Sequence, residues 1–130
     1  MKNILTLSIL LLAFISASSQ TSTFSLIGKW QEIEYSENVY GKNGLTPVIQ
    51  SIKNGRVFVF GKNNIVKDGL GNKGTYYLKA DCLHIKLAKV NFYYYIHYDT
   101  NNKKRLNFSP VDEKCRFECD EGCSYIFKKI

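Results

Sequence analysis

The stretch that decides the fold is residues 73–130, which read KGTYYLKADCLHIKLAKVNFYYYIHYDTNNKKRLNFSPVDEKCRFECDEGCSYIFKKI. Short runs in this stretch alternate apolar and polar residues, are rich in Tyr, Phe and Ile, and are separated by Gly, Asn, Asp and Pro. This pattern is typical of consecutive antiparallel hairpins. Hairpins with one apolar face bury that face by closing on themselves or by packing on a second sheet. The stretch therefore predicts an all-β barrel or sandwich.

The spacing of the apolar residues also predicts how these hairpins pair. We expect three pairings across the turns: Leu78 with Leu83, Leu87 with Phe92, and Tyr98 with Lys104. With these pairings the apolar residues of successive strands share one inward face: Tyr76, Leu78, Leu83, Ile85, Leu87, Phe92, Tyr94, Ile96, Leu106 and Phe108. A shift of one residue would turn the apolar side chains of a strand outward. The agreement of the pairings therefore predicts one continuous inner face.

The end of the chain predicts one more hairpin and the disulfides. Strands at 114–119 and 123–129 would flank a turn ending in glycine, with Phe117 opposite Tyr125. In an exported chain the four cysteines are expected to form disulfides. Cys119 faces Cys123 across the turn and is its favoured partner. The remaining pair is Cys82 with Cys115, whose side chains point to different faces in this arrangement, so a bond between them would contradict the last hairpin.

The preceding part of the chain adds shorter elements. We expect a first strand at 26–35 and short strands at 57–60 and 64–67, followed by a glycine-rich loop at 69–74. Residues 37–46 read as a long, polar, irregular loop. The total of eight to ten strands favours an antiparallel up-and-down barrel.

The N-terminal residues predict export. Residues 1–19 contain a lysine, an apolar run and a group of small residues, which together indicate a cleaved signal peptide. The apolar run is shorter than the roughly 20 residues that a transmembrane helix needs. We therefore expect no transmembrane segment, a secreted or periplasmic protein, and a single domain at 20–130.

Charge and motifs argue against several kinds of site. The sequence has 18 basic and 11 acidic residues. Because Lys2 lies in the signal peptide, the rest of the chain keeps 17 basic residues and has a net charge of +6. The basic residues are spread along the chain without interleaved aromatic residues, which argues against a nucleic-acid groove. No Ser-His-Asp set, His-Glu-x-x-His motif or phosphate loop is evident, so we expect no enzyme and no cofactor. Cys82, His84 and His97 share the outward face, but they lack an evident fourth ligand, so we expect no metal site.

Three short motifs resemble one family. They are Gly28-Lys29-Trp30 at the start of the first strand, Gly74-Thr75-Tyr76 with Leu83-His84-Ile85, and the closing Tyr125-Ile126-Phe127-Lys128-Lys129. They resemble the Gly-x-Trp opening, the mid-barrel hairpin and the last strand of lipocalins and small bacterial lipocalin-like proteins. The resemblance implies an eight-stranded barrel in which Gly28 and Trp30 mark the closed end. Lys128 or Lys129 would cover Trp30 in place of the usual Arg, and the open mouth would hold a small apolar ligand.

Two functions are consistent with this pattern. The first is a non-catalytic barrel that binds a small hydrophobic molecule in its interior, lined by Tyr76, Ile85, Tyr94, Ile96, Leu106, Phe108, Phe117 and Tyr125. The same side chains could instead fill the interior, since an eight-stranded barrel is only just wide enough for them. The alternative is a protein-binding module, or an inhibitor of a secreted enzyme, that uses the outward Tyr77, Tyr93 and Tyr95. A binder of anionic surfaces is a third hypothesis.

Overall fold

The computed structural model describes residues 24–130, so the signal peptide expected at 1–19 lies outside the described residues. Nine strands make up the described chain: β1 (Gly28–Gly41), β2 (Gly44–Ser51), β3 (Val57–Phe60), β4 (Ile65–Asp68), β5 (Lys73–Lys79), β6 (Cys82–Leu87), β7 (Val90–Asp99), β8 (Asn102–Pro110) and β9 (Cys123–Lys129). Within residues 24–130 no helix has the length and apolar character needed to cross a membrane.

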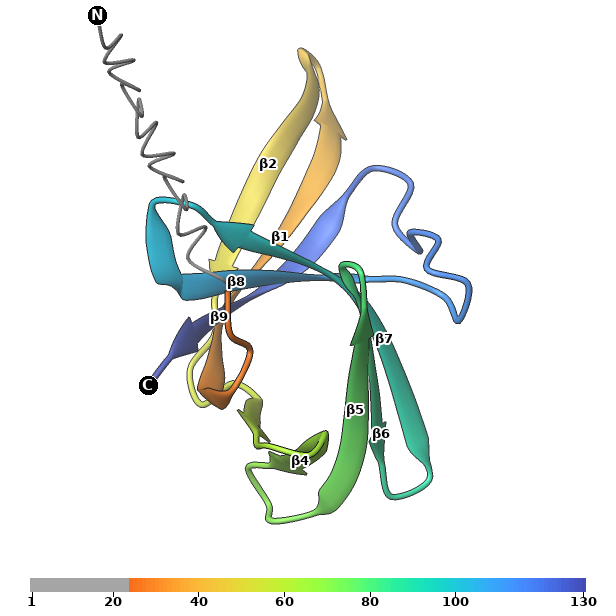
Figure 1. The fold of residues 1–130 in the computed structure, drawn as a ribbon. Helices are drawn as coiled ribbons and strands as arrows, with labels where there is room; N and C mark the ends of the chain where they lie inside the picture. Colours follow the sequence, from red (N-terminus) through yellow and green to blue (C-terminus); the bar gives the residue numbers. More distant parts are fainter. Residues whose placement is uncertain (1–23) are drawn as a thin grey trace, which may run out of the picture.

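The strands form a closed, antiparallel up-and-down barrel of eight strands (Figure 1). Strands β1 and β3 to β9 pair in chain order, and β9 pairs with β1 to close the ring. The predicted fold class is confirmed. Because each strand of the ring has a neighbour on both sides, the apolar face of every strand points into one common interior.

Strand β2 lies outside the ring and extends β1 as a hairpin. The first part of β1 pairs with β3, and its second part pairs with β2 from Glu34↔Ser51 to Gly41↔Gly44. The predicted irregular loop at 37–46 is therefore wrong. Both faces of this hairpin are largely exposed, so its residues carry no apolar alternation that would reveal a strand. The hairpin projects beyond the end of the barrel (Figure 1).

The predicted pairings are correct in face but partly wrong in register. Leu78 pairs with Leu83 as predicted. Leu87 pairs with Val90, and Tyr98 pairs with Leu106, so both of these registers differ by two residues from the prediction. The β6–β7 turn is shorter than expected, and Ala88 reaches it by taking a φ of 52°. In the β7–β8 hairpin the register shifts the other way, because an irregularity between Tyr98 and Asp99 leaves extra residues in β8. A shift by two residues preserves the alternation, so the same side chains still point inward.

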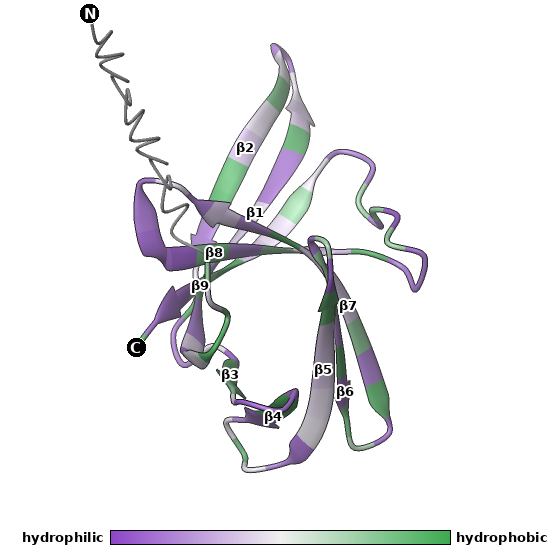
Figure 2. Cartoon of the chain, in the orientation of Figure 1, coloured by the Kyte–Doolittle hydropathy of each residue, from purple (hydrophilic) through white to green (hydrophobic). Residues whose placement is uncertain are grey.

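The interior is a packed aromatic and aliphatic core. Apolar and polar residues alternate along the strands of the ring (Figure 2). Most of the predicted inward residues are buried: Leu83, Ile85, Leu87, Tyr94, Ile96, Leu106 and Phe108. They are joined by further aromatic and aliphatic residues: Trp30, Phe58, Phe60, Val66 and Phe127. Leu78 departs from the prediction because it lies near the end of β5, where 42% of it is exposed.

The last predicted hairpin is wrong, whereas both disulfides are confirmed. Residues 112–122 form an irregular loop, and β9 pairs with β8 and β1 instead of a strand at 114–119. Closing the ring uses both edges of β9, which leaves no edge for a further hairpin partner. The bonds are Cys82–Cys115, with a Cα–Cα distance of 6.1 Å, and Cys119–Cys123, with 5.7 Å. The first bond fastens the 112–122 loop to the start of β6.

Candidate functional site: the open mouth of the barrel

One end of the barrel is closed around Trp30. Its side chain is fully buried, and its Nε1 donates a hydrogen bond to the Leu26 carbonyl oxygen at 2.8 Å. Of the two lysines expected to cover it, Lys129 lies over the ring, with Nζ 5.5 Å from the ring centroid. Gly28 is required here, because a Cβ would lie 2.5 Å from Lys129 Cε and the φ of 134° is strained for other residues.

The middle of the barrel is filled by its own side chains. Phe108 and Phe127 pack with ring centroids 4.4 Å apart, and Phe58 lies 5.6 Å from Phe127. Four residues predicted to line a ligand pocket belong to this core: Ile85, Ile96, Leu106 and Phe108. A fifth, Tyr76, is half-buried and donates its hydroxyl hydrogen to the Gly61 carbonyl oxygen at 2.9 Å. At this level the interior is a core and not a pocket.

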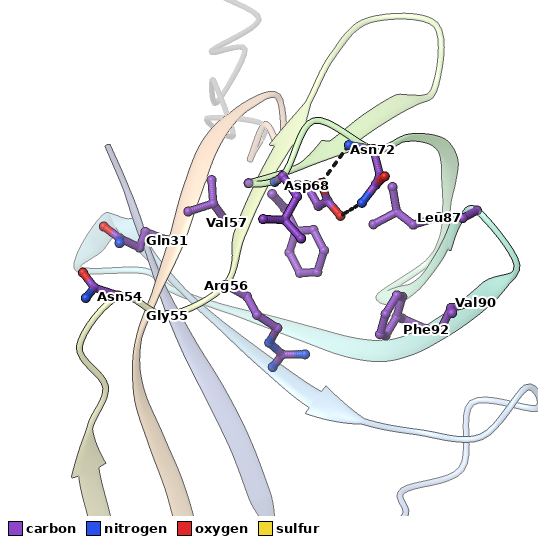
Figure 3. A pocket seen from close by; sticks show the side chains of 14 residues that line it. Gln31, Asn54, Gly55, Arg56, Val57, Asp68, Asn72, Leu87, Val90 and Phe92 are labelled. Atoms are coloured by element: carbon purple, nitrogen blue, oxygen red, sulfur yellow. Dashed lines mark hydrogen bonds between the residues drawn. The ribbon is translucent and has the colours of Figure 1, made fainter.

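The opposite end is hollow. A cavity of about 610 Å³ opens between the β2–β3 link, the β4–β5 loop and the β6–β7 turn. Its wall is mainly apolar and includes Val57, Phe58, Leu70, Leu87, Val90 and Phe92. Figure 3 shows Arg56 projecting inward from the link, opposite Leu87, Val90 and Phe92. The β4–β5 loop that forms the rim is held by Asp68, whose carboxylate accepts hydrogen bonds from Asn72 (Figure 3).

A second cavity of about 390 Å³ adjoins the first. It shares Arg56 and Phe92 with the larger cavity and is also lined by Tyr35, Tyr94 and Tyr125. Tyr94 and Tyr125 are therefore the residues of the predicted lining set that the structure places at the mouth. Phe117 was predicted to point into the barrel, and this is wrong. It lies on the outside, 59% exposed, because its segment is a loop and not a strand.

A buried ion pair lies at the base of the mouth. Glu32 is only 5% exposed and points inward from β1. Its Oε2 accepts from Arg56 Nε at 2.7 Å and from the Arg56 backbone nitrogen at 3.2 Å. An isolated carboxylate costs several kcal/mol to bury, so Glu32 depends on Arg56. The guanidinium also donates to the Tyr94 hydroxyl at 3.0 Å and stacks 4.3 Å from the centroid of the Tyr125 ring.

The chain reaches this arrangement through an irregular link between β2 and β3. Between Ser51 and Val57 the link carries more residues than the facing part of β1, yet Glu32 N still donates to the Arg56 carbonyl oxygen at 2.8 Å. Gly55 lies against the Glu32 carbonyl so closely that a Cβ would collide with it. The close approach holds the backbone of Arg56 beside Glu32 and directs its side chain into the mouth.

The protonation states in the mouth follow from these contacts. Burial lowers the pKa of Arg56, but the hydrogen bond to Glu32 and the neighbouring charges outweigh this and raise its pKa overall. Burial raises the pKa of the Tyr94 hydroxyl, and the nearby Arg56 only partly opposes that shift. At neutral pH, therefore, Arg56 is charged and Tyr94 keeps its proton. The mouth offers N–H and O–H donors.

Sequence reasoning missed Glu32 and Arg56. Glu32 could have been found, because it lies two residues after Trp30 in the first strand and so shares its inward face. Arg56 gave no such signal, since it belongs to the irregular link, where no periodicity assigns a direction to its side chain. The ion pair is visible only once the link is folded against β1.

The outward aromatic residues form a separate cluster on β5, β6 and β7. The His84 ring stacks on Tyr93 at 4.5 Å and meets the edge of Tyr77 at 5.3 Å. The outward trio considered for zinc is not brought together, because Cys82 is bonded to Cys115 and faces Tyr95, not His97, across β6 and β7. Among residues 24–130 no group of three His, Cys, Asp or Glu side chains could hold a metal ion.

No protein-family model and no curated protein matches this chain. The function is therefore inferred from the geometry of the barrel mouth.

Proposed function

We propose that this protein is an exported, non-catalytic, lipocalin-like barrel that binds a small, largely apolar molecule at its open mouth. The observation that carries the proposal is the cavity of about 610 Å³ at one end of a closed barrel, walled by apolar side chains. Ligand pockets typically measure about 300–1,000 Å³ and combine an apolar wall with a few polar groups. The mouth has both features, since Arg56 and Tyr94 lie at its base.

The packed core limits how deep the ligand goes. Phe58 is shared between the core and the cavity wall, so it forms the floor on which an apolar group would rest. The ligand is expected to lie against Val57, Leu87 and Phe92 and not to reach Trp30. The contact between Trp30 and Lys129 supports the lipocalin-like assignment, and the two disulfides support export, because disulfides persist in oxidising compartments.

A pair of matched variants tests this proposal. Val90, at the mouth, is 52% exposed, and Leu45, on β2 outside the ring, is 49% exposed. We expect Val90→Trp to fill the mouth and weaken binding of Nile red, a neutral lipophilic dye, by about tenfold or more. Leu45→Trp should bind the dye as the wild type does. Wild-type protein that fails to bind Nile red and yields no extractable ligand, or equal binding by Val90→Trp, would refute the proposal.

A second function is favoured by the outward aromatic cluster. Tyr77 is 53% exposed, and with His84 and Tyr93 it forms a stacked surface of the kind that protein interfaces favour. A protein-binding role, including inhibition of a secreted enzyme, would use this surface. It predicts that Tyr77→Ser abolishes capture of a partner from the secreted protein fraction, whereas Val90→Trp does not. Capture that survives Tyr77→Ser would contradict this role.

A further inference from the structure

We propose that the ligand carries an uncharged hydrogen-bond acceptor, such as a ketone, ester or amide carbonyl, and that this group binds between Arg56 and Tyr94. The inference rests on the proposed function and specifies its ligand. It also states that the mouth discriminates against carboxylates, although an arginine at the base of a pocket is usually associated with an anion.

The first argument is the number of donors left in the mouth. A guanidinium has five N–H groups. Two contact Glu32, through Nε at 2.7 Å and Nη2 at 3.4 Å, and one contacts Tyr94 at 3.0 Å. The remaining N–H groups belong to a side chain that lines both cavities and is 39% exposed. They are available to an acceptor in the mouth.

The Tyr94 hydroxyl supplies a further donor. Its oxygen accepts from Arg56, and among the hydrogen bonds of residues 24–130 its own O–H has no acceptor. Tyr94 lines the cavity of about 390 Å³, so a ligand oxygen there could accept from Tyr94 and Arg56 together. The Glu32 oxygens, by contrast, are covered by Arg56. The site therefore presents donors and selects a ligand with an acceptor.

The second argument is charge. Glu32 is buried in direct contact with Arg56, so the pair as a whole is neutral. A ligand carboxylate on the free N–H groups would be attracted by Arg56. It would also be repelled by the Glu32 carboxylate, which would lie only slightly farther from it than Arg56 does. In a partly dehydrated site water screens this repulsion weakly. Glu118, on the wall of the cavity that Tyr94 lines, and Asp68, on the wall of the adjoining larger cavity, add further negative charge. A carbonyl group keeps the hydrogen bonds and avoids the repulsion.

The third argument is that Arg56 cannot leave Glu32 to meet an anion. The Arg56 backbone nitrogen also donates to Glu32, and Gly55 fixes the link against β1. Moving the guanidinium away would leave Glu32 buried with only one backbone donor. Stacking on Tyr125 at 4.3 Å holds the guanidinium plane in addition. The charge compensation is therefore a permanent property of the site.

The test compares 2-decanone with decanoate, which is ionised at neutral pH, by displacement of Nile red. We expect the ketone to bind at least about tenfold more tightly than decanoate. Tyr94→Phe keeps the ring and should weaken ketone binding by about fivefold, the value of one neutral hydrogen bond, with little effect on decanoate. Glu32→Gln removes the compensating charge and should shift the preference toward decanoate.

The outcomes separate this inference from the proposed function. Decanoate binding as tightly as the ketone, with both ligands sensitive to Val90→Trp, would overturn the inference and leave the binding function intact. Failure of the wild type to bind either ligand or the dye would refute the binding function itself. If Glu32→Gln does not fold, as judged by its thermal transition, Tyr94→Phe decides: unchanged ketone affinity overturns the inference.

Discussion

Replacing Arg56 by Met should reveal how strongly the fold depends on the ion pair in the mouth. Met retains much of the apolar stem but leaves Glu32, 5% exposed, as a buried carboxylate without its partner. Breaking a buried pair from one side costs about 3–5 kcal/mol. The cost arises at Glu32, because the Arg56 side chain is 39% exposed and solvent already screens its own charge.

The partner substitutions make this prediction specific. Glu32→Gln should cost less than Arg56→Met, since the charge it leaves unpaired can be hydrated. In the double variant no charge is buried, so it should recover most of the loss caused by Arg56→Met. The free energy of unfolding is measured by chemical denaturation, followed by the fluorescence of Trp30, with the disulfides intact.

The size of the loss measured for Arg56→Met gives the test. A loss below about 1 kcal/mol at neutral pH, within the range of exposed ion pairs, would refute the reasoning. So would a larger cost for Glu32→Gln than for Arg56→Met.

Three further predictions concern the loops. Replacing Cys82 and Cys115 together by Ser removes a cross-link of sequence separation 33 and should lower the free energy of unfolding by about 3–4 kcal/mol; an unchanged denaturation midpoint would contradict this. Ala88→Gly should stabilise the protein by about 1 kcal/mol, because Ala88 holds a φ of 52° in the left-handed region. A lower melting temperature would show that the turn is not strained. The hydrogen bonds from Asn72 lower the pKa of Asp68 in the folded protein. The ionised Asp68 therefore holds the β4–β5 loop at neutral pH, and this stabilisation of the loop is lost as the pH falls through that lowered pKa. Carboxyl NMR shifts that place the pKa at or above its ordinary value of about 3.9 would contradict it.

The sequence predicted the class of fold and the inner face because both depend on a periodicity of two. Leu83, Ile85 and Phe108 point inward whether their strands pair in the predicted register or two residues away from it. The exact registers depend on the turns, and the Ala88-Lys89 turn lacks the Asn-Gly or Asp-Gly pair that marks a two-residue connection.

The site was less accessible to sequence reasoning because it is built from irregular backbone. The packed middle of the barrel was predicted from the alternation of apolar and polar residues. The mouth, however, is formed by the link carrying Arg56, the β4–β5 loop and the β6–β7 turn. None of these has a periodicity that assigns a direction to a side chain. The strand β2 was missed for a related reason, since neither of its faces is buried.

The position of β2 outside the ring has a consequence for solubility. A closed barrel has no free strand edge, but within the described residues β2 is paired on one side only, with β1. An open edge that carries Leu45 and Ile49, both exposed, could template pairing with other chains. Pro47 lies in the middle of this strand. A proline is tolerated in a strand where its nitrogen faces away from the partner, so the missing N–H falls on the open edge, interrupts the row of donors and guards the protein against aggregation.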